Sequence, residues 1–235
     1  MKRESVNRIR YVLEEWLPPV VRDSGLMRRL FRLHWGPFID DLERFRMHIT
    51  QLSAEDYRSV YERMPRIQDE TDNSRACLEE IAARVVSGRV CDVGCGTGYL
   101  INFLKQRPEL AGAEFHGVDF IIEAETARRD AAITFTAAPI ERLPFPDRHF
   151  DTVICTHVLE HILDIRAAIG ELRRICRRRL ILVVPLEREH RFTFNPHLHF
   201  FPYPHSFLRH IIPVPAQHSL KTIGRDLLYV EEIGA

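Results

Sequence analysis

The chain has 235 residues, of which 45% are hydrophobic and 28% are charged, an ordinary balance for one globular domain with or without an extension. Its 33 Lys and Arg residues match its 33 Asp and Glu residues, so the overall charge gives no reason to expect nucleic acid as a partner. The five cysteines form no CxxC pair and indicate a reducing compartment. The first residues lack the apolar segment of a signal peptide, and no apolar run reaches the length of a membrane span. We therefore expect a cytoplasmic protein.

Residues 1–75 show few strand signals and many apolar positions at helical spacing. Ser53, followed by Asp56 three residues later, is typical of a helix N-terminus. The segment is basic at its start, and its aromatic residues either pack in a core or touch the inner face of a membrane, where a lipid-linked ligand would lie. The sequence predicts a helical extension over 1–75 that serves as a lid or as a contact for a partner. Its apolar positions include Leu26, Leu30, Leu33, Leu42, Phe45 and Ile49.

From residue 76 onward, short apolar runs alternate with segments of helical period. Strands separated by helices indicate right-handed βαβ units and a largely parallel sheet. A stretch rich in Pro, His and Phe follows residue 185, and a last strand or hairpin is predicted near 227–230. The predicted strands cover 89–93, 115–119, 133–137, 152–156 and 180–184, and the predicted helices cover 76–86, 99–106, 121–130 and 165–176.

A glycine-rich turn joins the first predicted strand to the next helix. Residues 92–98 read Asp-Val-Gly-Cys-Gly-Thr-Gly, and the following strand ends at Asp119. The glycines permit a tight turn, the helix N-terminus offers free N–H groups, and a carboxylate at Asp119 can accept hydrogen bonds from ribose hydroxyls. A P-loop is excluded because no Lys-Ser/Thr pair follows. The third glycine comes one residue too early for the dinucleotide fingerprint, with Tyr99 in its place, so a nicotinamide-dependent oxidoreductase is the weaker alternative.

The segment from about 76 to 186 resembles the class I methyltransferases, especially the small-molecule group with a "type 11" methyltransferase domain. The resemblance implies a Rossmann-like α/β fold with a mostly parallel seven-stranded sheet flanked by helices. It also implies S-adenosyl-L-methionine as cofactor and S-adenosyl-L-homocysteine as product. It rests on residues 90–98, 117–120, 143–147, 150–162, 171–174 and 180–185.

By this resemblance, Asp92 and the glycine turn surround the methionine part of the cofactor, Asp119 holds the ribose, and Phe120 lies against the adenine. Many relatives carry an Asp near the end of the third strand for the adenine amino group. Residues 137–140 contain no carboxylate here, so we expect backbone groups near Ile140 to replace it. The expected cofactor-binding residues are Asp92, Gly94, Cys95, Gly96, Thr97, Gly98, Asp119, Phe120, Ile140 and Thr156.

The resemblance implies methyl transfer to a small-molecule acceptor, or to a lipid- or glycan-linked one, and we expect an oxygen atom as the target. The domain would span 76–235, with 186–218 as an acceptor-site insertion and the extension 1–75 helping to close the pocket. No nucleic-acid acceptor is expected, because the Asn/Asp-Pro-Pro-Tyr/Phe signature is missing after the fourth strand. A catalytically silent methyltransferase-fold protein with a binding or regulatory role is the alternative, favoured by the missing adenine carboxylate.

Histidine is the natural base near neutral pH if the acceptor must lose a proton. Six of the twelve histidines lie between 190 and 218, and our catalytic candidates are His157, His197 and His199. His161 is expected to satisfy a local hydrogen bond, and Glu187 to be a solvated loop carboxylate rather than part of the acceptor pocket. No Cys or carboxylate completes a recognisable ligand spacing, so we predict no metal site.

Overall fold

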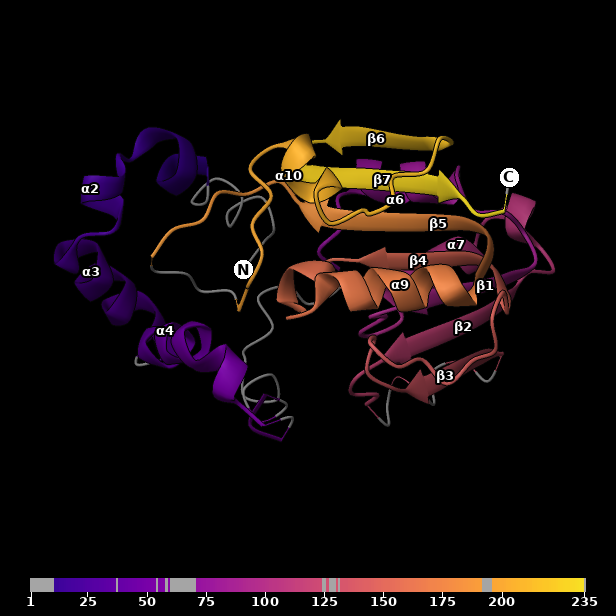
Figure 1. Ribbon diagram of the computed structural model, residues 1–235, viewed down its shortest axis with the longest axis horizontal. Coiled ribbons are helices and arrows are strands. Elements are labelled where there is room, and N and C mark those ends of the chain that lie inside the picture. The colour runs from indigo at the N-terminus through magenta and orange to yellow at the C-terminus, as the bar shows by residue number, and fades with distance from the viewer. Residues whose placement is uncertain are drawn as a thin grey trace.

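A seven-stranded sheet forms the centre of the protein, with strand order β3-β2-β1-β4-β5-β7-β6 (Figure 1). The computed structural model describes residues 11–36, 38–53, 55–57, 59, 71–123, 126, 130, 132–191 and 196–234. The first five strands pair in parallel, and β7 is antiparallel to both β5 and β6. The predicted α/β fold with a mostly parallel seven-stranded sheet is therefore confirmed. The strands are β1 (Arg89–Val93), β2 (Glu114–Asp119), β3 (Ile133–Ala137), β4 (Phe150–Thr156), β5 (Cys176–Pro185), β6 (His218–Ile223) and β7 (Asp226–Glu232).

Strands β4 and β5 lie inside the sheet, and most of their residues are buried because helices cover both faces. In β5 every residue from Leu180 to Val184 is buried, the pattern expected of a strand inside a parallel sheet. This strand begins at Cys176, four residues earlier than predicted. The added residues carry arginines that pair along the sheet, Arg177 with Asp151 and Arg179 with Glu232.

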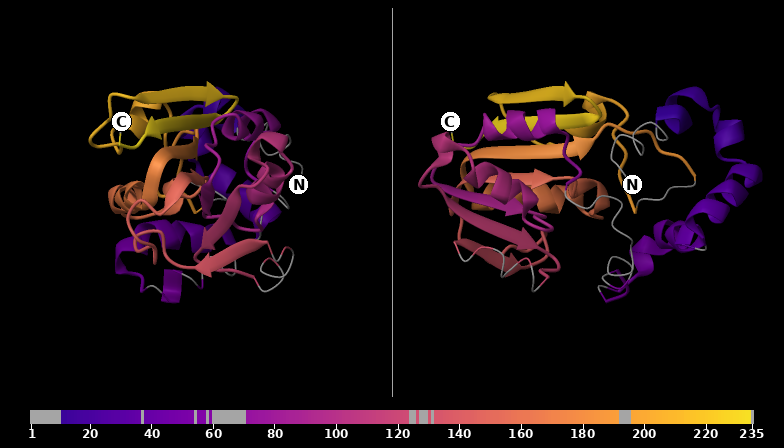
Figure 2. Two further views of the ribbon diagram at one scale, coloured as in Figure 1. Left: turned by 90° about the vertical axis from the view of Figure 1, so that its right-hand side faces the viewer. Right: turned by 180° about the vertical axis from the view of Figure 1, so that it is seen from behind.

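Helices on the two faces build two separate core clusters. The helix α9 (Ile165–Ile175) packs on one face together with Phe201 and Phe207. The helices α6 (Arg75–Ala82) and α7 (Tyr99–Lys105) pack on the other face, which Figure 2 shows from behind. Of the predicted helix 121–130, residues 121–123 are not helical, and 124–125 and 127–129 lie outside the described residues. Three short helices complete this part, namely η3 (Pro108–Leu110), η4 (Leu159–His161) and α10 (Pro204–Leu208).

The N-terminal helices lie beyond the carboxyl ends of the parallel strands (Figure 1). Arg46 holds them to the segment after β5, through an ion pair with Glu189 at 2.6 Å and a hydrogen bond to the carbonyl of His190 at 3.0 Å. Ser53 accepts a hydrogen bond from the amide of Asp56 at 3.1 Å, as predicted for a helix N-terminus. The described helices are η1 (Val12–Trp16), α2 (Pro19–Arg22), α3 (Gly25–Trp35), α4 (Phe38–His48) and η2 (Ile49–Gln51).

Among the residues that the structure describes, no helix combines the length and the apolar character needed to cross a membrane.

Candidate functional site

The glycine-rich turn crosses from the end of β1 to the end of β2. The amides of Gly94 and Cys95 both donate to the carbonyl of Val118, at 2.7 and 3.0 Å. Gly94, Gly96 and Gly98 all have positive φ, between 51° and 81°, which side chains with a Cβ rarely adopt. A Cβ at Gly94 would stand 2.0 Å from the Cγ2 of Val158, whereas a Cβ at Gly96 would meet nothing within 4 Å. The turn is therefore tightly packed at its first glycine and open to a ligand at its second.

Asp119 stands at the end of β2, directly against this turn. One of its carboxylate oxygens accepts a hydrogen bond from the amide of Gly96 at 2.8 Å, and the other accepts from the amide of Ile121 at 3.2 Å. The sequence placed Asp119 beside the glycine turn, and the structure brings them into contact. A carboxylate thus lies at the open part of the turn.

Asp92 is a buried carboxylate at the end of β1, with only 3% of its surface exposed. Among the described residues, its Oδ1 atom has no hydrogen-bond partner. Burial, followed by the nearby charge of Asp119, raises the pKa of Asp92 to about 7. A buried carboxylate without a partner is unfavourable, so this position favours a ligand that brings a positive charge or an N–H donor.

The end of β4 is joined to the segment before α6 by Asn73, which the sequence analysis missed. Its side-chain amide donates to the hydroxyl oxygen of Thr156 at 3.0 Å and to that of Thr71 at 3.3 Å. Asn73 is buried, although it lies between a polar segment and the helix cap Ser74. Only the hydrogen bond between this segment and the end of β4 shows that Asn73 positions Thr156.

His157 follows β4 and has a φ of 55°, an uncommon conformation for a residue with a side chain. Its Nδ1 lies 3.6 Å from the carboxylate of Glu160, and its Nε2 lies 3.6 Å from that of Asp226. Burial alone would lower the pKa of His157, but these carboxylates outweigh that effect and raise it. In turn, although burial acts to raise the pKa of Glu160, His157 and the other imidazoles lower it. Both shifts stabilise an ion pair between the Glu160 carboxylate and the protonated form of His157.

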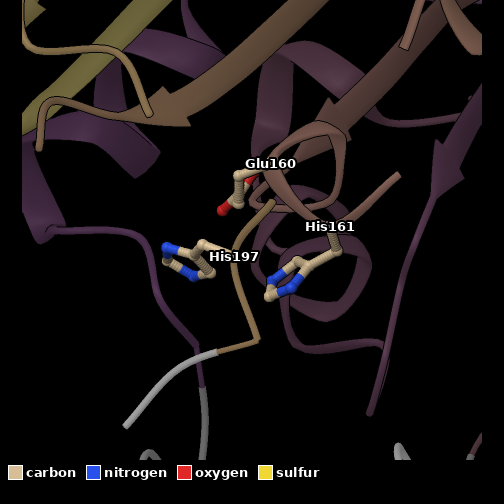
Figure 3. Close-up of side chains that lie close together, drawn as sticks. All are labelled: Glu160, His161 and His197. Atoms are coloured by element: carbon tan, nitrogen blue, oxygen red, sulfur yellow. The ribbon is translucent and has the colours of Figure 1, made fainter. Parts of the chain in front are cut away.

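Two of the other histidines lie beside Glu160 (Figure 3). Nδ1 of His197 forms a hydrogen bond with Glu187, and the His161 and His197 rings stand edge to face with centroids 4.6 Å apart. Removal from water, together with His197, lowers the pKa of His161 to about 4. Glu187 is only 4% exposed, so the expectation of a solvated loop carboxylate is wrong. It folds inward because it partners a buried imidazole.

The remaining predicted residues take different positions. His199 donates from Nε2 to the carbonyl of Ile162 at 2.8 Å, and thus contacts a different partner from His197. Phe120 is partly exposed beside Asp119, with the ring of Tyr57 edge-on at 6.5 Å. The Ile140 side chain is buried in the core, which leaves only its backbone for a ligand. Within the turn, Cys95 is buried and Thr97 is partly exposed.

Tyr57 ties the N-terminal extension to this site. Its hydroxyl donates to the carbonyl of His161 at 2.9 Å, while its ring faces Phe120. The extension therefore reaches both the histidine cluster and the end of β2, a contact that no spacing in the sequence indicated.

Known proteins are similar to this chain over the segment that contains the glycine turn and β4. Residues 91–184 fit the family model of a methyltransferase domain. A demethylmenaquinone methyltransferase of Roseiflexus sp. (strain RS-1) is 33% identical over 108 residues, which cover 44% of each chain. A ubiquinone biosynthesis O-methyltransferase of Bordetella avium is 31% identical over 94 residues, covering 37% of each. The chain thus spans less than half the length of these curated relatives.

A solved structure from Pyrococcus horikoshii OT3 is similar over most of the chain. It aligns with a TM-score of 0.52 and 18% identity, and covers 77% of this chain and 92% of the other. At this identity the likeness concerns the fold. It extends beyond the segment that the family model matches.

Proposed function

We propose that the chain, whose residues 91–184 fit a methyltransferase domain, is a class I, S-adenosylmethionine-dependent methyltransferase that transfers a methyl group to a small-molecule or lipid- or glycan-linked acceptor. The observation that carries the proposal is the buried Asp92 carboxylate, whose Oδ1 has no hydrogen-bond partner among the described residues, next to an open glycine turn. Asp92 favours a ligand with a positive charge, and Asp119 beside the turn favours one with a nucleoside part.

The residues present fit this cofactor. S-Adenosylmethionine carries a sulfonium and an ammonium group, and when bound it supplies an activated methyl group. Asp92 would accept hydrogen bonds from the cationic end, and Asp119 would accept from the ribose hydroxyls. Gly96 leaves room for close approach of the ligand to the backbone, and Phe120 offers an aromatic edge for the adenine.

We further propose that the acceptor atom is an oxygen and that His157 accepts its proton. The ring stands at the end of β4, held between Glu160 and Asp226. The two carboxylates make the imidazole a stronger base, so the neutral ring can take the proton of a hydroxyl group and hold it as an imidazolium beside Glu160 and Asp226. His199 is the weaker candidate, because its Nε2 already donates to the Ile162 carbonyl.

The extension 1–75 is proposed to contact the acceptor and the inner membrane face, with 76–235 as the catalytic domain and 186–218 as an acceptor-site insertion. Leu26, Leu30 and Leu33 recur at the spacing of one helix face of α3, and they are 67%, 49% and 84% exposed. The exposed Arg29 lies about one turn from Leu26 and Leu33 on the same helix, a combination that suits the surface of an anionic membrane. A lipid-linked acceptor would be bound there. Co-sedimentation with anionic vesicles tests this, and equal binding by a Leu30→Glu, Leu33→Glu variant would contradict it.

Titration calorimetry with S-adenosylhomocysteine tests the cofactor site. We expect micromolar affinity, about −8 kcal/mol. Asp119→Ala should bind at least about 10-fold more weakly, because it removes hydrogen-bond acceptors worth about 1.5–3 kcal/mol. Glu109→Gln, at an exposed position, is the matched control. Absence of binding heat in the wild type would refute the proposal, whereas binding without methyl transfer to any extract fraction would favour the catalytically silent alternative.

A further inference from the structure

Glu160, His161 and His197 come together although they lie on two separate segments. Each offers one ligand atom, and the three atoms lie within 4.8 Å of one another. Figure 3 shows the Glu160 carboxylate and the two imidazole rings facing a common space. Glu160 and His197 are buried, and His161 is partly buried. Two imidazoles and a carboxylate are the donor set that divalent transition metals prefer.

The Glu160 carboxylate points to a ligand in this space. It is 1% exposed, and among the described residues its Oε2 atom has no hydrogen-bond partner. Its Oε1 atom faces His157 at 3.6 Å, so the ion pair engages only one side of the carboxylate. A buried carboxylate oxygen of this kind is costly unless a cation or a donor reaches it.

His197 is held in the manner of a metal ligand. Its Nδ1 forms a hydrogen bond with the buried carboxylate of Glu187. A proton on Nδ1, shared with Glu187, leaves the lone pair of the ring on Nε2 and fixes the ring orientation. Carboxylates in this position are common behind metal-binding histidines, where they raise the basicity of the ligand.

The backbone also fixes the two segments together. The amides of Leu198 and His199 donate to the carbonyl of Glu160 at 2.7 and 3.0 Å. His197 is therefore anchored next to η4 by the residues that directly follow it. The cluster does not depend on a single long side chain, and small side-chain rotations would bring its three atoms to one ion.

We propose that Glu160, His161 and His197 bind a divalent transition-metal ion, with Glu187 as the positioning residue behind His197. Three protein ligands leave a fourth position of a tetrahedral site open, as in catalytic zinc sites. If the proposed methyl transfer is correct, that position would hold an oxygen of the acceptor next to His157. This last point rests on the proposed function, but the ion site itself does not.

The test uses the full chain, stripped of metal with a chelator and titrated with Zn²⁺ by calorimetry. Substitution by Co²⁺ adds an absorption spectrum that reports the ligand geometry. We expect one Zn²⁺ per chain, with binding abolished or weakened at least about 100-fold in His197→Ala and Glu160→Gln, and weakened about 10- to 100-fold in Glu187→Gln. His205→Ala, which removes an exposed imidazole, is the matched control and should bind as the wild type does.

Binding of S-adenosylhomocysteine by the same samples separates this proposal from the previous one. Retained affinity for S-adenosylhomocysteine shows that the variants are folded. This binding and the binding of Zn²⁺ are separate results, so either proposal can fail without the other. Absence of Zn²⁺ binding in the wild type would overturn the ion site, as would equal Zn²⁺ affinity in the wild type and His197→Ala. Loss of methyl transfer in His197→Gln, with no ion bound to the wild type, would also overturn it and make the His197–Glu187 pair a general base.

Discussion

Replacement of Asp92 by Asn should make the protein more stable at alkaline pH while weakening its binding of S-adenosylmethionine. Asp92 is buried at the end of β1, and its Oδ1 atom has no hydrogen-bond partner among the described residues. Ionisation of this carboxyl in the folded protein is therefore unfavourable until a cationic ligand arrives. Asparagine keeps the shape of the side chain and removes the charge.

The magnitude follows from the pKa of Asp92, which rises from 3.8 to about 7 on folding, equivalent to about 4 kcal/mol. Because the folded state holds this proton more tightly than the unfolded chain, the stabilisation is complete below about pH 4 and is lost as the pH rises through about 7. Between pH 5 and pH 8 the wild type should lose about 3 kcal/mol of unfolding free energy relative to Asp92→Asn. The groups that both proteins share cancel in this difference.

Urea unfolding without cofactor at several pH values from 5 to 8 measures this difference. Glu109→Gln, which removes an exposed carboxylate, should follow the wild type throughout. Parallel pH profiles for the wild type and Asp92→Asn would refute the reasoning, because they would mean that Asp92 ionises as easily in the folded protein as in the unfolded chain.

Two further changes test the glycine turn and the sheet. Gly94→Ala places a Cβ 2.0 Å from Val158 at a φ of 81°, and should lower the free energy of urea unfolding by about 3 kcal/mol. Gly96→Ala meets open space, so it should lower this free energy by only about 1 kcal/mol, although it should still impair cofactor binding. Equal losses in the two variants would contradict the packing argument. Arg173→Met removes the guanidinium that contacts the fully buried Glu231 at 2.6 and 2.7 Å, and should lower stability by about 3–5 kcal/mol. Thermal unfolding within a few degrees of the wild type would show that Glu231 does not depend on this partner.

Local patterns were enough to predict the elements around the proposed cofactor site. Alternation of apolar runs with helical periods depends on neighbouring residues alone, so β1, β2 and β3 were predicted to within one residue. The glycine turn and Asp119 were also recognisable, because a strand, a tight turn and a helix N-terminus follow one another directly in the chain. Parallel pairing then brings the ends of β1 and β2 together, where the Gly96 amide meets Asp119.

The sequence by itself thus determined the fold class and the glycine turn with Asp119, whereas the tertiary structure decided the histidine cluster that we propose as the acceptor end. His197 and Glu160 are far apart in the chain, and Glu187 reads as an ordinary loop carboxylate until burial beside His197 gives it a partner. Asn73 and Tyr57 likewise reach the site only through long-range contacts. Such contacts leave no period in the sequence, because the free energy that selects them comes from burying and pairing polar groups of distant segments.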